Sequence, residues 1–160
     1  MIRDARVDDV SAIRAIWNDV IATSTITFTT VEKTDADIEG LLALRPVFVA
    51  EDAGQVIGFA SFGAFRGGPG YRFVAEYTIY LNESHHGRGF AEALLESVEK
   101  RASLDGIDTL IAGIDGGNGR AQQFHKKNGF SHVGLLPGVG EKFGARHDLV
   151  LMQKKLNVSR

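Results

Sequence analysis

The apolar positions of the first third of the chain keep helical spacing in two segments. The first of these begins two or three residues after a short alternating run at the N-terminus. The second begins where Thr34 and Asp37 form a capping-box-like pair, and Pro46 stops it. The expected elements are a strand at Ile2–Arg6, an amphipathic helix from Asp8 or Asp9 to about Ala22, and a second helix between Thr34 and Pro46.

After Pro46 the period changes to that of strands. Three alternating runs follow one another, separated by a turn at Asp52-Ala53-Gly54 and by the glycine-rich break Arg66–Gly70. Consecutive runs joined in this way predict an antiparallel meander. The three expected strands are Val47–Glu51, Val56–Phe65 and Tyr71–Leu81.

The second half alternates helical and strand patterns. The expected elements are a long helix at Gly89–Ser103, an apolar strand at Asp108–Ile114, a shorter helix at Asn118–Lys127, and final strands at Phe130–Leu136 and Asp148–Lys154. The resulting order is β-α-α-β-β-β-α-β-α-β-β. A meander combined with a β-α-β crossover predicts an α/β fold with a mixed sheet and helices on both faces.

Composition narrows the class of protein. The 160 residues fit a single domain over residues 1–160, and the net charge of −2 gives no basic excess for nucleic-acid binding. The chain contains no cysteine, and the adjacent His85 and His86 do not present both rings to one ion easily, so we expect no metal site. The charged N-terminus and the lack of a long apolar run predict a cytoplasmic protein that does not bind membranes.

The most informative glycines lie where a strand ends and the long helix begins. Gly87 and Gly89 there would place unpaired backbone N–H groups at the positive end of the helix dipole, which suits an anion such as pyrophosphate. A plain tight turn would also explain both glycines. Glu92 stands at the sixth position counted from Gly87, which excludes the dinucleotide fingerprint, and no Gly-Lys pair allows a Walker loop.

Two segments resemble the GNAT superfamily of N-acyltransferases. His86-Gly87-Arg88-Gly89-Phe90-Ala91 is similar to the superfamily's R/Q-x-x-G-x-G/A acyl-CoA motif. The superfamily also has a second motif further downstream, and the residues that match it here are Asn118, Ala121, Phe124, His125 and Gly129-Phe130. The resemblance spans essentially the whole chain and narrows to the phosphinothricin and methionine sulfoximine acetyltransferase group. The features that narrow it include Ile2–Ala5, Trp17-Asn18, Ser24 with Phe28, Tyr71-Arg72 with Glu76, and Val139–Gly144 with Asp148.

The resemblance implies acetyl-CoA as co-substrate, a small-molecule amine as acceptor, and a homodimer. By the family pattern, the main chain of one strand end pairs with the pantetheine arm and the following loop holds the pyrophosphate. The residues expected to bind acetyl-CoA are Ile79, Tyr80, Leu81, His86, Gly87, Arg88, Gly89, Phe90, Ala91, Glu92 and Asn118. His125 would deliver a proton to the leaving sulfur, unless it is a packing histidine.

Glu76 is the candidate general base. It lies in an otherwise apolar strand, where desolvation would raise its pKa and suit it to take a proton from an amine. A carboxylate on the solvent face, or one paired with Arg72, is the alternative. Arg72 could instead hold an acceptor carboxylate with its planar fork. Tyr77, which stands where the group usually has histidine, completes the expected acceptor site.

These residues predict an enzyme that moves the acetyl group of acetyl-CoA to the α-amine of a small amino acid or analogue. Acceptors of the phosphinothricin, methionine sulfoximine and methionine sulfone type are expected. The alternatives are another amine, such as a polyamine, an aminoglycoside or a protein N-terminus, and a non-catalytic acyl-CoA-binding sensor. Glu76 argues against the sensor because binding alone needs no base.

Overall fold

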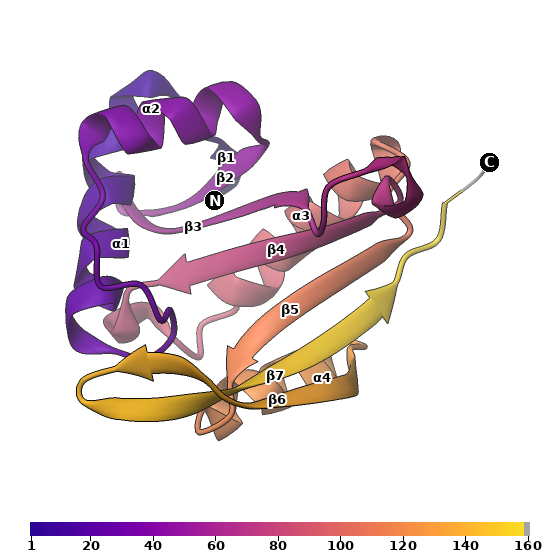
Figure 1. The fold of residues 1–160 in the computed structure, drawn as a ribbon. Coiled ribbons are helices and arrows are strands. Elements are labelled where there is room, and N and C mark those ends of the chain that lie inside the picture. Colours follow the sequence, from indigo (N-terminus) through magenta and orange to yellow (C-terminus); the bar gives the residue numbers. More distant parts are fainter. Residues whose placement is uncertain (159–160) are drawn as a thin grey trace.

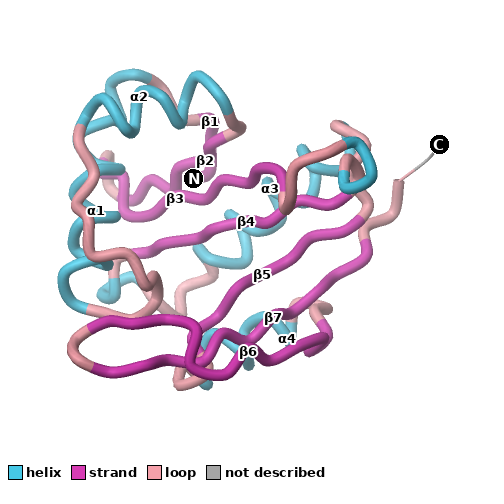
Figure 2. Tube along the Cα trace, in the orientation of Figure 1, coloured by secondary structure: helices cyan, strands magenta, loops and turns pink. Residues whose placement is uncertain are grey.

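The computed structural model describes residues 1–158, which form a continuous seven-stranded sheet with helices on both faces (Figures 1 and 2). The strands are β1 Ile2–Asp4, β2 Val47–Asp52, β3 Gln55–Ala64, β4 Val74–Leu81, β5 Thr109–Asp115, β6 Ser131–Lys142 and β7 Ala145–Lys155. The helices are α1 Val10–Thr23, α2 Asp35–Leu44, α3 Phe90–Leu104 and α4 Gly119–Lys127. Short 3-10 turns occupy Val7–Asp9, Pro69–Tyr71 and Glu83–His85.

The strand order across the sheet is β1-β2-β3-β4-β5-β7-β6. Every neighbouring pair of strands is antiparallel except β4 and β5, which run parallel because α3 crosses over between them. The expected α/β class, order of elements and mixed sheet are therefore confirmed. None of the helices within residues 1–158 has the length and apolar character needed to cross a bilayer.

Two cores hold the helices against opposite faces of the sheet. On one face, α1 and α2 pack over β2 and β3, with Ile13, Ile16 and Ile38 buried. The other face carries a larger core under α3, with Leu94, Leu95 and Val98 buried. The expected cap of α2 is present: the Thr34 hydroxyl accepts from the Asp37 N–H at 3.2 Å, and the Asp37 carboxylate accepts from the Thr34 N–H at 2.8 Å.

The side chain of Trp17 lies in the first of these cores, on α1. Its ring centroid is 5.6 Å from that of Phe59 and 5.8 Å from that of Tyr80. Because successive residues of a strand point to opposite faces, Tyr80 and Glu76 of β4 share this side of the sheet, while Tyr77 points into the α3 core.

Several expected boundaries were wrong, the first being the end of β1, which lies at Asp4 instead of Arg6. The strand expected from Tyr71 begins at Val74, because Gly68 with a φ of 96° and Pro69 start a 3-10 turn that includes Tyr71. The last hairpin is longer than expected and runs to Lys142 before its turn. Its glycines and Pro137 indicate a loop, yet β6 is an edge strand with a register irregularity between Leu136 and Gly140, and such strands accept proline.

Candidate active site

The strands β4 and β5 separate along their length. They pair only where residues 74–76 face residues 109–111, and beyond Glu76 β4 stays paired with β3 while β5 stays paired with β7 (Figure 1). One side of the main chain at residues 77–81 therefore faces an opening in the sheet instead of a neighbouring strand.

The N-terminus of α3 lies beside this opening and is shaped by two glycines. Gly87 has a φ of 78° and Gly89, the residue before the helix, a φ of 87°, a left-handed conformation that side chains rarely adopt. No side chain caps the first turn of α3, so its amides present partial positive charge. The imidazole Nε2 of His86 lies 3.1 Å from the Leu81 carbonyl oxygen and ties this loop to the end of β4.

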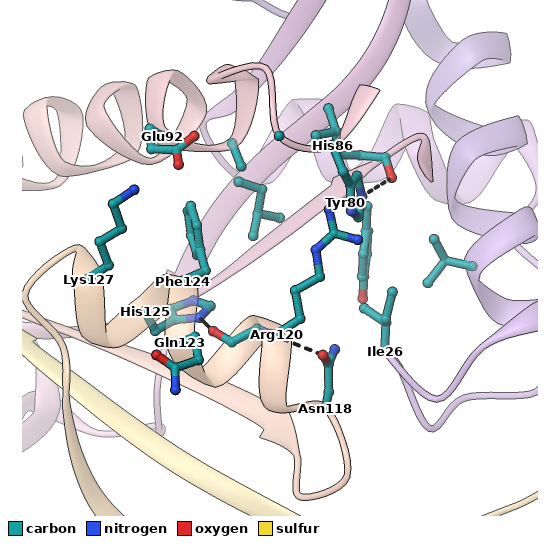
Figure 3. Close-up of a pocket in the computed structure, with 16 residues that line it drawn as sticks. Ile26, Tyr80, His86, Glu92, Asn118, Arg120, Gln123, Phe124, His125 and Lys127 are labelled. Atoms are coloured by element: carbon teal, nitrogen blue, oxygen red, sulfur yellow. Dashed lines mark hydrogen bonds between the residues drawn. The ribbon is translucent and has the colours of Figure 1, made fainter. Parts of the chain in front are cut away.

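A cavity of about 550 Å³ lies between β4, α3 and α4 (Figure 3). Most of the residues expected to bind acetyl-CoA line it: Ile79, Tyr80, Leu81, His86, Gly87, Ala91, Glu92 and Asn118. Arg88, Gly89 and Phe90 are not among its lining residues. The Arg88 guanidinium donates to the Asp52 carboxylate at 3.1 Å, and Phe90 packs against the α3 core. Arg88, Gly89 and Phe90 therefore help to fix the conformation of the loop and do not line the cavity.

Helix α4 contributes a polar stripe that sequence reasoning missed. Arg120, Gln123 and Lys127 line the same cavity. Figure 3 shows Arg120 reaching toward Tyr80 and His86, and Lys127 lying across from Glu92. The spacing of three and four residues could have shown that these side chains share one helix face. Arg120 and Lys127, two cations near the uncapped N-terminus of α3, suit a phosphate-bearing ligand.

A second cavity of about 300 Å³ lies in the opening between β4 and β5. Its lining includes Glu76, Tyr77, Gly113 and Asp115, together with residues 26–28 of the loop after α1. The two cavities adjoin, because they share the lining residues Ile26, Ile79, Tyr80, Asn118, Ala121 and His125. The loop residues and Gly113 had not been assigned to the site from the sequence.

Glu76 lies in this second cavity between two glycines. Gly63 pairs with it on β3, and on β5 a Cβ added to Gly113 would lie 3.2 Å from its Oε2 atom. Partial burial raises the pKa of the Glu76 carboxyl, while the positive charge of Arg45 opposes that rise. The guanidinium of Arg45 occupies the space that a side chain at Gly63 would fill. A carboxylate with a raised pKa beside a cavity is suited to accept a proton.

Arg72 lies apart from both cavities. Its backbone is helical in the turn before β4, and its guanidinium donates to the Pro69 carbonyl at 3.1 Å and lies 4.4 Å from the Phe73 ring centroid. Within residues 1–158 no ion pair joins Arg72 to Glu76. The cation whose charge acts on Glu76 is instead Arg45, at the end of α2.

His125 is buried and hydrogen-bonded through both ring nitrogens. Its Nδ1 lies 2.7 Å from the carbonyl oxygen of Ala121, and its Nε2 contacts the hydroxyl of Tyr77. Since a carbonyl only accepts, Nδ1 carries the proton and Nε2 accepts from Tyr77. Burial lowers the pKa of His125 and raises that of Tyr77, so both groups are neutral near pH 7.

Asn118 and Asp115 complete the site. The Asn118 side-chain oxygen accepts from the Ala121 N–H at 3.0 Å and so caps α4. Asp115 accepts from the Thr25 hydroxyl and from the Gly117 N–H, which joins the loop after α1 to the end of β5. Among the residues that the structure describes, no group of three histidines, aspartates or glutamates could hold a metal ion.

Comparisons with known proteins agree with this geometry. The family model for the acetyltransferase (GNAT) family matches residues 14–130. An L-methionine sulfoximine/L-methionine sulfone acetyltransferase of Pseudomonas aeruginosa is 34% identical, over 99% of this chain and 96% of its own length. The crystal structure of an N-acetyltransferase from Staphylococcus aureus has a TM-score of 0.94 and 38% identity, covering 98% of each chain.

A further solved structure carries a ligand. A phosphinothricin acetyltransferase of Sinorhizobium meliloti in complex with acetyl-CoA has a TM-score of 0.93 and 31% identity, covering 98% of this chain and 88% of its own. Fold and sequence therefore agree over nearly the whole length, and the family model agrees over residues 14–130. The chain belongs to the acetyltransferase (GNAT) family.

Proposed function

We propose that this acetyltransferase moves the acetyl group of acetyl-CoA to the α-amine of a small amino acid or analogue, of the phosphinothricin, methionine sulfoximine or methionine sulfone type. The observation that carries the proposal is the opening between β4 and β5, which joins the cavity at the start of α3 to the cavity that holds Glu76. The acceptors of the Pseudomonas and Sinorhizobium proteins support the choice of substrate.

The residues of the first cavity fit acetyl-CoA. The main chain of Ile79–Leu81 has one edge that no neighbouring strand pairs with, as the amide-bearing pantetheine arm of acetyl-CoA needs. The uncapped amides after Gly87 suit the pyrophosphate of acetyl-CoA. Arg120 and Lys127 add positive charge along the wall. When bound, acetyl-CoA supplies an acetyl group activated as a thioester.

Glu76 would accept a proton from the acceptor's ammonium group, directly or through a water. A free α-ammonium has a pKa of about 7.7–8.0, so the amine is mostly protonated near pH 7 and benefits from a base. The freed nitrogen lone pair then forms a C–N bond to the acetyl carbon. The C–S bond breaks, and its electron pair leaves with the sulfur, which takes up a proton. The nitrogen, which is positively charged after the attack, loses its second proton to give the neutral amide.

His125 is the proposed donor of that last proton, because it lies on the boundary of both cavities. Its Nδ1–H is bonded to Ala121 in the structure, so donation requires the ring to exchange that partner for the sulfur and to take up the Tyr77 hydroxyl proton at Nε2 in the same step. The proton that the new amide nitrogen loses then restores the Tyr77 hydroxyl. A His125→Gln variant should lower kcat and leave the Kd for acetyl-CoA within about twofold. An unchanged kcat would leave protonation to solvent.

Arg72 is proposed as the anchor for the acceptor's carboxylate, with Glu76 and Tyr77 forming the rest of the acceptor site. Arg72 lies outside both cavities, so this role requires its exposed guanidinium to leave the Pro69 carbonyl and turn toward the acceptor. We expect Arg72→Ala to raise the KM for carboxylate-bearing acceptors about tenfold, as the loss of a charged hydrogen bond does. An equal rise for an amine without a carboxylate would contradict the anchor role.

The decisive experiment is a coenzyme A release assay with a panel of amines. Because the chain has no cysteine, a thiol reagent reads released coenzyme A without a protein background. Phosphinothricin and methionine sulfone should give the highest kcat/KM. Higher values for spermidine, kanamycin or a peptide N-terminus would move the activity to another amine. Acetyl-CoA binding without release for any amine would make the protein a sensor.

We further propose that residues 1–160 act as one catalytic domain in a cytoplasmic homodimer. The edge strand β6 exposes apolar side chains, which supports a partner on that side. They are Val133, Leu135, Leu136 and Val139, with Phe143 in the turn that follows. Light scattering should give twice the mass of the 17.3 kDa chain, and a single-chain mass would contradict the dimer.

A further inference from the structure

Lys142, the last residue of β6, is a buried cation. Its side chain is 2% exposed, and its Nζ donates to the carbonyl oxygens of Ser24 at 2.6 Å and Thr27 at 2.9 Å. Burial lowers its pKa, and no ion pair joins it to a carboxylate within residues 1–158. An apolar side chain of similar length would avoid the cost of desolvating that charge. Stability alone therefore does not explain a lysine here.

The two carbonyls that Lys142 binds belong to the loop at residues 24–28, which we call the acceptor loop. This loop follows α1 and forms neither helix nor strand. Three of its residues, Ile26, Thr27 and Phe28, line the same cavity as Glu76. The position of the loop therefore sets the shape of the space in which the acceptor meets the base.

The strands of the β6–β7 hairpin contact the acceptor loop at a second point, Phe28. A Cβ at Gly140 would overlap the Phe28 ring, so only glycine leaves room for it there. The Phe28 ring also stacks on His147, with centroids 5.7 Å apart and planes 19° apart. The His147 Nε2 in turn lies 2.9 Å from the carbonyl oxygen of Lys142. Both contacts fix the loop from a hairpin more than 110 residues away in the sequence.

We infer that Lys142 is a positioning residue for the acceptor. By drawing the carbonyls of residues 24 and 27 toward the hairpin, it holds the acceptor loop across from Glu76 and fixes a cavity of about 300 Å³, a size suited to a small amino acid. The inference rests on the proposed function. Lys142 does not line the first cavity, and of the acceptor loop only Ile26 does, so Lys142 should affect the acceptor far more than acetyl-CoA binding.

The kinetic test is Lys142→Met, which keeps the length and removes the donor. We expect the KM for the best amino-acid acceptor to rise about tenfold or more, since small displacements of substrate-positioning groups cost that much, while the KM for acetyl-CoA stays within twofold. The matched control is Lys155→Met at the opposite end of the hairpin, where the exposed lysine donates to Thr109 at 2.8 Å. It should leave both KM values unchanged. Equal losses for both substrates in Lys142→Met, or none, would overturn the inference.

A second readout does not depend on activity. Hydrogen exchange of peptides covering residues 24–28 should be faster in Lys142→Met than in the wild type and in Lys155→Met. Unchanged exchange would overturn the role of Lys142 even in an active enzyme. A wild type that acetylates no amino acid, with exchange still faster in the variant, would instead refute the proposed function and keep the positioning role.

A Gly140→Ala variant reaches the same loop from Phe28 and keeps Lys142 intact. The added methyl group displaces the ring, so the acceptor KM should rise again with acetyl-CoA binding unchanged. This variant keeps the inference falsifiable if Lys142→Met does not fold. An unchanged acceptor KM in a folded Gly140→Ala protein would contradict control of the acceptor by this loop.

Discussion

The two halves of the active site are built in different ways. The acetyl-CoA side uses main-chain groups from a continuous stretch, the end of β4 and the start of α3, together with one face of α4. The acceptor side gathers the acceptor loop, Glu76, Gly113 of β5 and the supporting β6–β7 hairpin from distant parts of the chain. Main-chain recognition depends little on side-chain identity, whereas the acceptor cavity changes with any of several separate side chains.

This difference predicts that substitutions on the acetyl-CoA side abolish acetyl-CoA binding, whereas substitutions on the acceptor side change the rate of acetyl transfer. Gly89→Glu should have the largest effect, because it forces a side chain onto a φ of 87° and places a carboxylate at the start of α3. Acetyl-CoA binding measured by calorimetry should be lost.

The matched control for Gly89→Glu is Gly106→Glu. Gly106 has a φ of 84° just beyond the other end of α3, so the backbone strain is the same and the cofactor site is far away. This protein should lose stability and still bind acetyl-CoA. Normal binding by Gly89→Glu would place the pyrophosphate elsewhere.

On the acceptor side, Glu76→Gln should lower kcat about 100-fold, the range expected for the loss of a general base. Its Kd for acetyl-CoA should stay within twofold, because Glu76 does not line the first cavity. Glu96→Gln, on the exposed face of α3, is the control and should keep full activity. A wild-type kcat in Glu76→Gln would remove Glu76 as the base.

The pH profile sharpens the comparison further. Glu76 must be deprotonated to accept a proton, so kcat/KM should fall as the pH is lowered through its raised pKa. Arg45 holds that pKa down, so Arg45→Gln should raise it and move the fall to higher pH. Arg14→Gln, which loses only a surface pair with Asp35, should not move it. A shift to lower pH in Arg45→Gln would contradict this arrangement.

The smallest effect is expected at the contact between Tyr77 and His125, the latter of which lines both cavities. Tyr77→Phe removes the hydroxyl bonded to His125 and leaves a buried Nε2 without its donor, at a cost of about 1–3 kcal/mol. A Tm lower by about 2–4 °C per kcal/mol should follow in a thermal melt. Tyr71→Phe, at an exposed ring, is the control. An unchanged Tm in Tyr77→Phe would mean that water replaces the hydroxyl.

The same contrast explains what the sequence could predict. The loop around Gly87 and the capping pair of Thr34 and Asp37 were predicted because their chemistry is local and lies in a few consecutive residues. Arg45, Gly113 and Lys142 were missed, because they reach the site through contacts between segments far apart in the chain. The start of β4 was misplaced because Tyr71 continues the apolar pattern while the preceding Gly68-Pro69 turn decides its backbone.

Trp17 gives the protein a built-in optical reporter. It is the single tryptophan of the chain, and its ring packs against Tyr80, which lines both cavities. Ligands that displace Tyr80 should change the emission of one indole, with no second fluorophore of its kind to mask the signal. Titrations of either substrate can therefore be followed by intrinsic fluorescence on unlabelled protein.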